Sequence, residues 1–97
     1  MSNIDWSKLI TKEAKDADRA AQVLDQMVAG ELSWRVVELA AIARQLEAIE
    51  EDEADETPSD LLPGTRKLWL KYRGLVSNWK EGAESFPDIA HRPVRPS

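Results

Sequence analysis

Residues Thr65 to Trp79 have the sequence TRKLWLKYRGLVSNW, and the fold that we predict for the whole chain is organised around this stretch. It holds two of the four tryptophans and the only tyrosine of the chain. Its main apolar positions follow steps of 4, 3 and 4, the period of one helical face: Leu68, Tyr72, Leu75 and Trp79. Thr65 is a suitable N-cap and Gly82 a natural C-terminal stop, so we predict an aromatic-basic helix over 65–82.

The aromatic face of this helix is typical of a core, with the basic residues solvated on the other side. Two alternatives stay open from the sequence. Basic residues beside tryptophan and tyrosine also suit stacking on nucleic-acid bases. An amphipathic helix of this kind can also lie on a membrane surface, although the acidic middle of the chain opposes anionic lipid.

The first half of the chain predicts a long amphipathic helix over 11–51, preceded by a lead-in over 1–10. Its apolar or small positions before Gly30 follow one helical seam: Ile10, Ala14, Ala17, Ala21, Leu24 and Val28. The seam continues beyond Gly30 through Leu32, Val36, Leu39, Ala43, Leu46 and Ile49. A glycine costs a helix only about 1 kcal/mol, so one long helix and a hairpin broken near Gly30 both remain open. The alanine-rich seam permits either intramolecular packing or a homo-oligomer.

The remaining segments carry no helical period. Residues 52–64 form an acidic linker with turn signals at Pro58 and at Pro63-Gly64, and 83–97 form a Pro-rich tail that should be extended. No strand pattern is evident. We therefore predict an all-α fold of two or three helices, namely the long helix or hairpin, the aromatic-basic helix, and an extended tail.

Charge is distributed unevenly. Residues 31–60 carry ten acidic and two basic side chains, whereas residues 61–97 carry seven basic and three acidic ones. Two segments of opposite net charge attract one another, within a chain or between copies. A nucleic-acid-binding protein usually presents a dominant basic surface, which a net charge of −5 does not favour.

Several kinds of chemistry have no support in the sequence. With no cysteine and a single histidine, His91, the chain offers no thiolate chemistry, multi-histidine metal site or nucleophile–base pair, so we expect no enzyme and no cofactor. The acidic run 50–60 lacks calcium-hand spacing and is better explained as a solvated linker than as a loose cation site. No apolar run is long enough to cross a bilayer and no signal-peptide core is present, which predicts a cytoplasmic location.

The C-terminal third resembles the terminal region of bacteriophage tail fibre assembly and tail assembly chaperones. Trp69, Tyr72 and Arg73 match a W-x-x-Y-R helix, and Phe86, Pro87, Asp88, Ile89, Pro93 and Pro96 match a proline-rich ending of the form F-P-D-I-x-W-P-x-x-P. This chain departs from that ending at its tryptophan, where it has Ala90-His91-Arg92. The resemblance implies a non-enzymatic helper that binds a phage tail or tail-fibre polypeptide in the host cytoplasm during assembly. An exposed Pro-rich segment suits a groove or a sheet edge, and adjacent aromatic residues supply anchors. The expected partner-binding residues are Trp69, Tyr72, Arg73, Trp79, Phe86, Pro87, Asp88, Ile89 and Pro93.

Two other functions compete with this one. The long helix suits a structural virion component, such as a tail or baseplate subunit that oligomerises. The acidic middle suits a decoy that mimics nucleic-acid phosphates and inhibits a host defence protein that binds nucleic acid.

Overall fold

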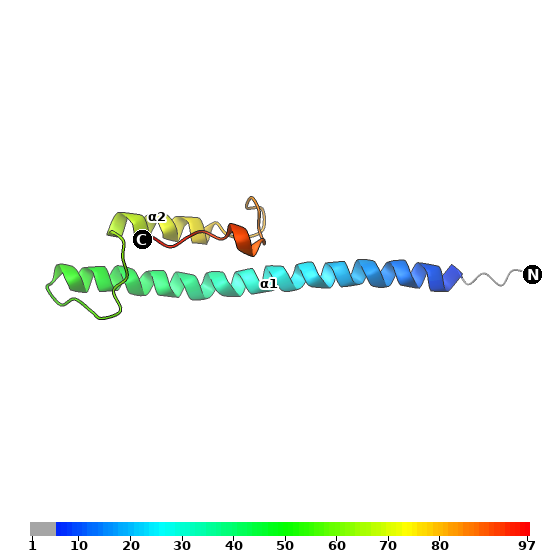
Figure 1. Ribbon diagram of the computed structural model, residues 1–97, viewed down its shortest axis with the longest axis horizontal. Coiled ribbons are helices and arrows are strands. Elements are labelled where there is room, and N and C mark those ends of the chain that lie inside the picture. The colour runs from blue at the N-terminus through cyan, green and yellow to red at the C-terminus, as the bar shows by residue number, and fades with distance from the viewer. Residues whose placement is uncertain (1–5) are drawn as a thin grey trace, which may run out of the picture.

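The computed structural model describes the backbone of residues 6–97 and the side chains of residues 15–97. The order of elements is a long helix α1 (Trp6–Glu53), a short helix α2 (Arg66–Ser77) and a 3₁₀ turn η1 (Ile89–His91). All regular structure in these residues is helical, which confirms the predicted all-α fold of two or three helices. The molecule is 86 Å long and only 22 by 16 Å across (Figure 1).

Helix α1 runs without a break through Gly30, so the hairpin alternative does not occur. A β-carbon at Gly30 would meet no atom within 4 Å, so no close packing there competes with the helix. The free-energy cost of one glycine, about 1 kcal/mol, is small for a helix of 48 residues. The helix also begins at Trp6, earlier than the predicted start at residue 11. Residues 1–5 of the predicted lead-in lie outside the described residues.

Helix α2 packs beside the C-terminal half of α1 in the opposite direction (Figure 1). The predicted cap at Thr65 is present, because its side chain accepts a hydrogen bond from the backbone N–H of Leu68. The helix ends at Ser77, before the predicted stop at Gly82. Asn78 caps it, and its backbone N–H donates to the carbonyl groups of Gly74 and Val76. Trp79 follows the apolar period of this helix in the sequence, and it is buried in the structure. It lies beyond the end of the helix, however, and enters the core from the turn that follows.

The core lies between α1 and α2, where Ile42, Trp69, Tyr72 and Val76 form a buried cluster. Partly buried side chains of α1 pack around this cluster: Trp34, Leu39, Leu46 and Ile49. The sequence assigned Leu32, Val36 and Ala43 to the same seam, and all three are exposed. The buried face of α1 instead includes polar side chains, and these three apolar residues lie outside it.

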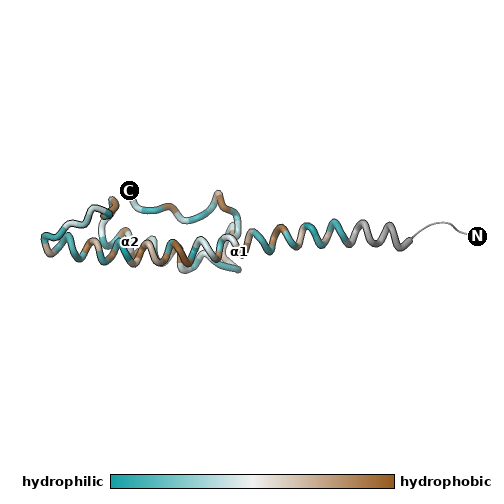
Figure 2. The backbone as a smooth tube through the Cα atoms, turned by 90° about the horizontal axis from the view of Figure 1, so that it is seen from below, coloured by the Kyte–Doolittle hydropathy of each residue, from teal (hydrophilic) through white to brown (hydrophobic). Residues whose placement is uncertain are grey.

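The C-terminal segment folds back along the two helices and ends near the start of α2 (Figure 1). The predicted extended tail over 83–97 is therefore only partly extended. It begins with turns, contains the single 3₁₀ turn η1, and only its last residues are extended. Figure 2 shows the same return path from a second direction. The tail is a packed part of this fold and not an arm in solvent.

The close approach of the chain end to the linker generates a stability prediction. Gly64 has φ +116°, and an added β-carbon there would lie 2.7 Å from Cβ of Pro96 and 2.8 Å from Nε1 of Trp69. We expect Gly64→Ala to lower the free energy of unfolding by about 2 kcal/mol or more, through backbone strain and displacement of the tail.

Gly74→Ala is the matched control, because a β-carbon at this helical position meets nothing within 4 Å. It should raise the free energy of unfolding by about 0.5–1 kcal/mol. Urea unfolding followed by circular dichroism measures both changes. Equal stability of Gly64→Ala and the parent chain would mean that the tail does not pack against Gly64.

Candidate protein-binding surfaces

Three buried polar residues lie on one face of α1 at intervals of seven residues: Glu31, Glu38 and Gln45. Seven residues make almost two helical turns, so the three side chains form a row on the face that α2 and the tail cover. Only 2% of Glu31 and 5% of Glu38 is exposed. A buried carboxylate is costly unless it is paired and hydrogen-bonded, so the partners of this row explain the fold.

Glu31 accepts hydrogen bonds from Nε1 of Trp79 at 3.1 Å and from Nε of Arg92 at 2.6 Å. The guanidinium group of Arg92 also lies 4.8 Å from the ring centroid of Trp34, in a cation–π arrangement. Arg92 is the main reason that the pKa of Glu31 is lowered, and the Trp79 hydrogen bond adds to the shift. Burial opposes the shift because it disfavours the charged form.

Glu38 repeats this arrangement two turns further along α1. It accepts hydrogen bonds from the hydroxyl group of Tyr72 at 2.7 Å and from Nε of Arg95 at 2.5 Å. Its pKa is lowered chiefly by Arg95, against the effect of burial. The pKa of Tyr72 is raised by burial and by the neighbouring carboxylate.

Gln45 completes the row on the linker side. Its carbonyl oxygen accepts from the backbone N–H of Leu62 at 2.8 Å, and its amide group donates to the carbonyl of Asp60 at 3.0 Å. The polar row thus binds α2, the tail and the linker to one face of α1. Because each group is paired, separating the tail from α1 would leave buried charges without partners.

The structure places the predicted partner-binding residues in very different environments. Trp69, Tyr72 and Trp79 are buried inside the chain, and Trp69 also donates its indole N–H to the carbonyl of Pro63. These three rings are therefore not available as exposed anchors, in agreement with the interpretation of the aromatic stripe as core. Their polar atoms have partners inside the chain, from the linker for Trp69 and from α1 for Tyr72 and Trp79.

The other predicted residues lie nearer the surface. Phe86 is half-buried and packs edge-on against Trp79, with ring centroids 5.3 Å apart. Asp88 caps η1 through the backbone N–H of Ala90 and contacts His91. Pro87 and Pro93 are half-buried, while Arg73 and Ile89 are exposed. The predicted set thus divides between the core and the surface, and the structure does not bring it together as one site.

Sequence reasoning missed the residues that organise this region: Glu31, Glu38, Gln45, Arg92 and Arg95. Two features of the sequence could have indicated them. The three α1 residues are spaced by seven, and the two arginines are spaced by three in a tail that faces an acidic middle segment. Attraction between the two charged parts was expected, and it occurs within the chain.

The acidic linker is partly neutralised by the same kind of contact. Arg44 binds Asp60 through its Nε at 2.8 Å and also binds Glu51 at 3.0 Å. Arg66 binds Glu53 at 2.8 Å. These pairs occupy several of the carboxylates that a phosphate-mimicking decoy would present. Within the described side chains, no cluster of three acidic or histidine residues has metal-binding geometry.

Several apolar surfaces are left uncovered in the described part of the chain, and two of them bear on binding. The first, which we call the α2–tail groove, is lined by Leu68, Lys71, Tyr72, Leu75, Val94 and Pro96. Of Val94, 85% is exposed, and Leu75 on the opposite wall is half exposed. The groove therefore combines one wall from α2 with one wall from the tail.

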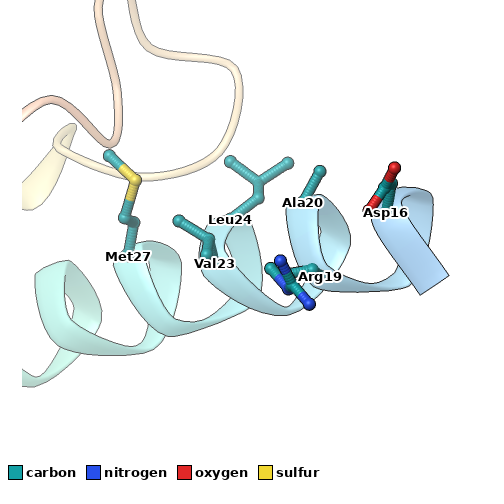
Figure 3. A pocket seen from close by; sticks show the side chains of 6 residues that line it. All are labelled: Asp16, Arg19, Ala20, Val23, Leu24 and Met27. Atoms are coloured by element: carbon teal, nitrogen blue, oxygen red, sulfur yellow. The ribbon is translucent and has the colours of Figure 1, made fainter.

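The second surface lies on the projecting segment, residues 6–30 of α1, which extends beyond α2 and the tail (Figure 1). Figure 3 shows Ala20, Val23, Leu24 and Met27 along it, beside Asp16 and Arg19. Leu24 is 52% exposed and Val23 50%. Exposed apolar side chains that lie close together on a helix are typical of an interaction surface.

Comparison with known proteins gives no relative: no family model, curated protein or solved structure matches the chain. Among the helices of the described chain, none has the length and apolar content required to span a bilayer.

The buried carboxylates predict an acid-sensitive fold. Because the pKa values of Glu31 and Glu38 are lower in the folded chain than their ordinary value of 4.5, the unfolded chain binds more protons in acid. Their contribution to stability is complete above this value and is lost as the pH falls through the folded-state pKa values. We expect the free energy of unfolding, measured by urea titration, to decrease below about pH 4.5.

The double variant Glu31→Gln/Glu38→Gln should be less stable at pH 7 and should lose less stability on acidification. Glu84→Gln, at an exposed position, is the control and should follow the parent chain. An unchanged acid dependence in the double variant would contradict the assignment of these two carboxylates.

Proposed function

We propose that this protein is a non-enzymatic phage tail assembly chaperone or accessory protein that binds a tail or tail-fibre polypeptide in its α2–tail groove. The observation that carries the proposal is the position of this groove. It is an uncovered apolar surface formed by the two segments that resemble tail assembly chaperones. The buried rings of the same segments hold its two walls in place.

The chemistry of the groove suits a short peptide segment. Leu68, Leu75 and Val94 offer apolar contacts from two sides, and burying them would favour association. Lys71 lies in the groove, with Lys67 and Arg73 exposed on the same helix. A partner segment with apolar side chains and a nearby carboxylate would match both features. The tail wall is already folded before binding, so little ordering entropy is lost.

Co-expression with phage tail and tail-fibre polypeptides tests this proposal. We expect a stoichiometric complex with one of them. Leu75→Asp and Val94→Asp place a charge in the groove at exposed positions, and each should weaken binding at least about tenfold, equal to ~1.4 kcal/mol. Val36→Asp is the matched control, because Val36 is exposed on α1 outside the groove. Undiminished binding by both groove variants would overturn the proposal.

A structural virion subunit is the second candidate, and the projecting segment favours it. A long helix that leaves the folded body suits assembly into a larger particle. Mass spectrometry of purified particles separates the two functions. A transient chaperone should be absent from particles, whereas a subunit should be present in fixed stoichiometry with other tail proteins.

A further inference from the structure

The face of α1 that α2 and the tail cover continues beyond them toward the N-terminus. From Glu31 onward its inner positions follow alternating steps of 3 and 4, and each of them is buried or half-buried: Glu31, Trp34, Glu38, Ala41, Gln45 and Ala48. The same steps lead back along the unbroken helix to Met27, Leu24 and Ala20, which are exposed. One helical face is thus covered in the folded body and uncovered before it.

Before the folded body this face is apolar. Figure 3 shows Ala20, Leu24 and Met27 on the side of α1 on which the chain segment after α2 lies. Val23 lies next to them in the same apolar surface. Half of Val23 and 40% of Met27 is exposed, although both are large hydrophobic side chains. We call these four residues the α1 extension face.

We propose that the α1 extension face binds an amphipathic helix of a different polypeptide, placed in line with α2 and beyond its C-terminal end. Helix α2 is the example within the chain of what covers these rows. Its buried residues Trp69, Tyr72 and Val76 follow the same steps of 3 and 4, and they pack against α1. Because the period on α1 does not change across Glu31, a helix packed at the same angle fits the uncovered rows. This binding uses no residue of the α2–tail groove.

The described part of the chain does not continue α2 over this face. Helix α2 ends at Ser77, and the turns that follow lead to η1 and back toward the start of α2 (Figure 1). Trp79 and Arg92 both bind Glu31 at the edge of the folded body. The covering helix therefore comes from outside the described chain, and it ends before this edge.

A second copy of this chain fits the α1 extension face poorly. In an antiparallel pair with its two-fold axis between Val23 and Leu24, residues 6–16 of one helix lie opposite residues 31–41 of the other. That space is already filled by α2 and the tail. In a parallel pair the two folded bodies collide, because each covers the same face of its own helix. A shorter helix that carries no such body avoids both conflicts.

The residues in and beside the face define the chemistry of the partner helix. It needs large apolar side chains at alternating steps of 3 and 4 over about three turns, or ~16 Å, to cover the face from Ala20 to Met27. Asp16 and Arg19 border the face at the end away from the folded body. A basic and an acidic side chain at the corresponding end of the partner helix would match them.

Fluorescence anisotropy of the full chain with a labelled synthetic peptide tests the binding. The probe is a helical peptide of roughly 21 residues with leucine at alternating steps of 3 and 4 and with glutamate and lysine elsewhere, held at trace concentration. We expect a Kd below about 100 µM. Leu24→Asp should raise this Kd at least tenfold, because it places a charge in the face at an exposed position. Gln26→Asp is the matched control, with the same charge change at an exposed position outside the face, and should leave the Kd unchanged.

Three further measurements separate this site from the alternatives. Leu75→Asp, in the α2–tail groove, should leave the Kd unchanged. A peptide of the same composition in scrambled order, without the apolar seam, should bind at least tenfold more weakly. Sedimentation equilibrium without peptide should find a monomer up to about 100 µM.

Absence of binding at about 100 µM, equal binding of the scrambled peptide, or binding that Leu24→Asp does not weaken would each overturn the proposal. A dimer that forms without peptide and is dissociated by Leu24→Asp would assign the face to a second copy and would overturn it as well. None of these outcomes depends on the binding of a tail polypeptide in the groove.

Discussion

Two buried glutamates on α1, each paired with an arginine of the C-terminal tail, hold this structure together. A carboxylate removed from water is stable only when donors surround it, and Glu31 and Glu38 each receive a guanidinium group and an aromatic N–H or O–H group. Trp79 and Tyr72 have the complementary requirement, because the N–H and O–H groups of buried rings need hydrogen-bond acceptors. One set of contacts satisfies both and fixes the tail against the helices.

This constraint divides α1 into two functional halves. From Glu31 onward the helix is covered by α2 and the tail, and together they form a small folded body. Before this body, the side chains of residues 15–27 on the same helix are exposed. The proposed binding of a polypeptide in the α2–tail groove would use only the folded body.

The groove owes its shape to the same interactions. The tail contributes Val94 and Pro96 to one wall only because Arg92 and Arg95 hold it beside α2. Trp69 and Trp79 are buried in the core, and Tyr72 both belongs to the core and lines the groove. In the proposed function the two tryptophans would act only through the position of the exposed groove residues.

The sequence by itself determined the helical class, the cap at Thr65 and the amphipathic character of both helices, because these features depend on local spacing and capping. It also indicated attraction between the acidic middle and the basic end. Only the tertiary structure decided which face of α1 is buried. Hydrophobic periodicity placed Leu32 and Val36 on the apolar seam, but in the structure both are exposed and Glu31 and Glu38 face the core. The physical reason is that a buried charge is acceptable only beside its partner, and the arginines lie about sixty residues away in the chain. No short-range pattern in the sequence shows that these glutamates and arginines are in contact.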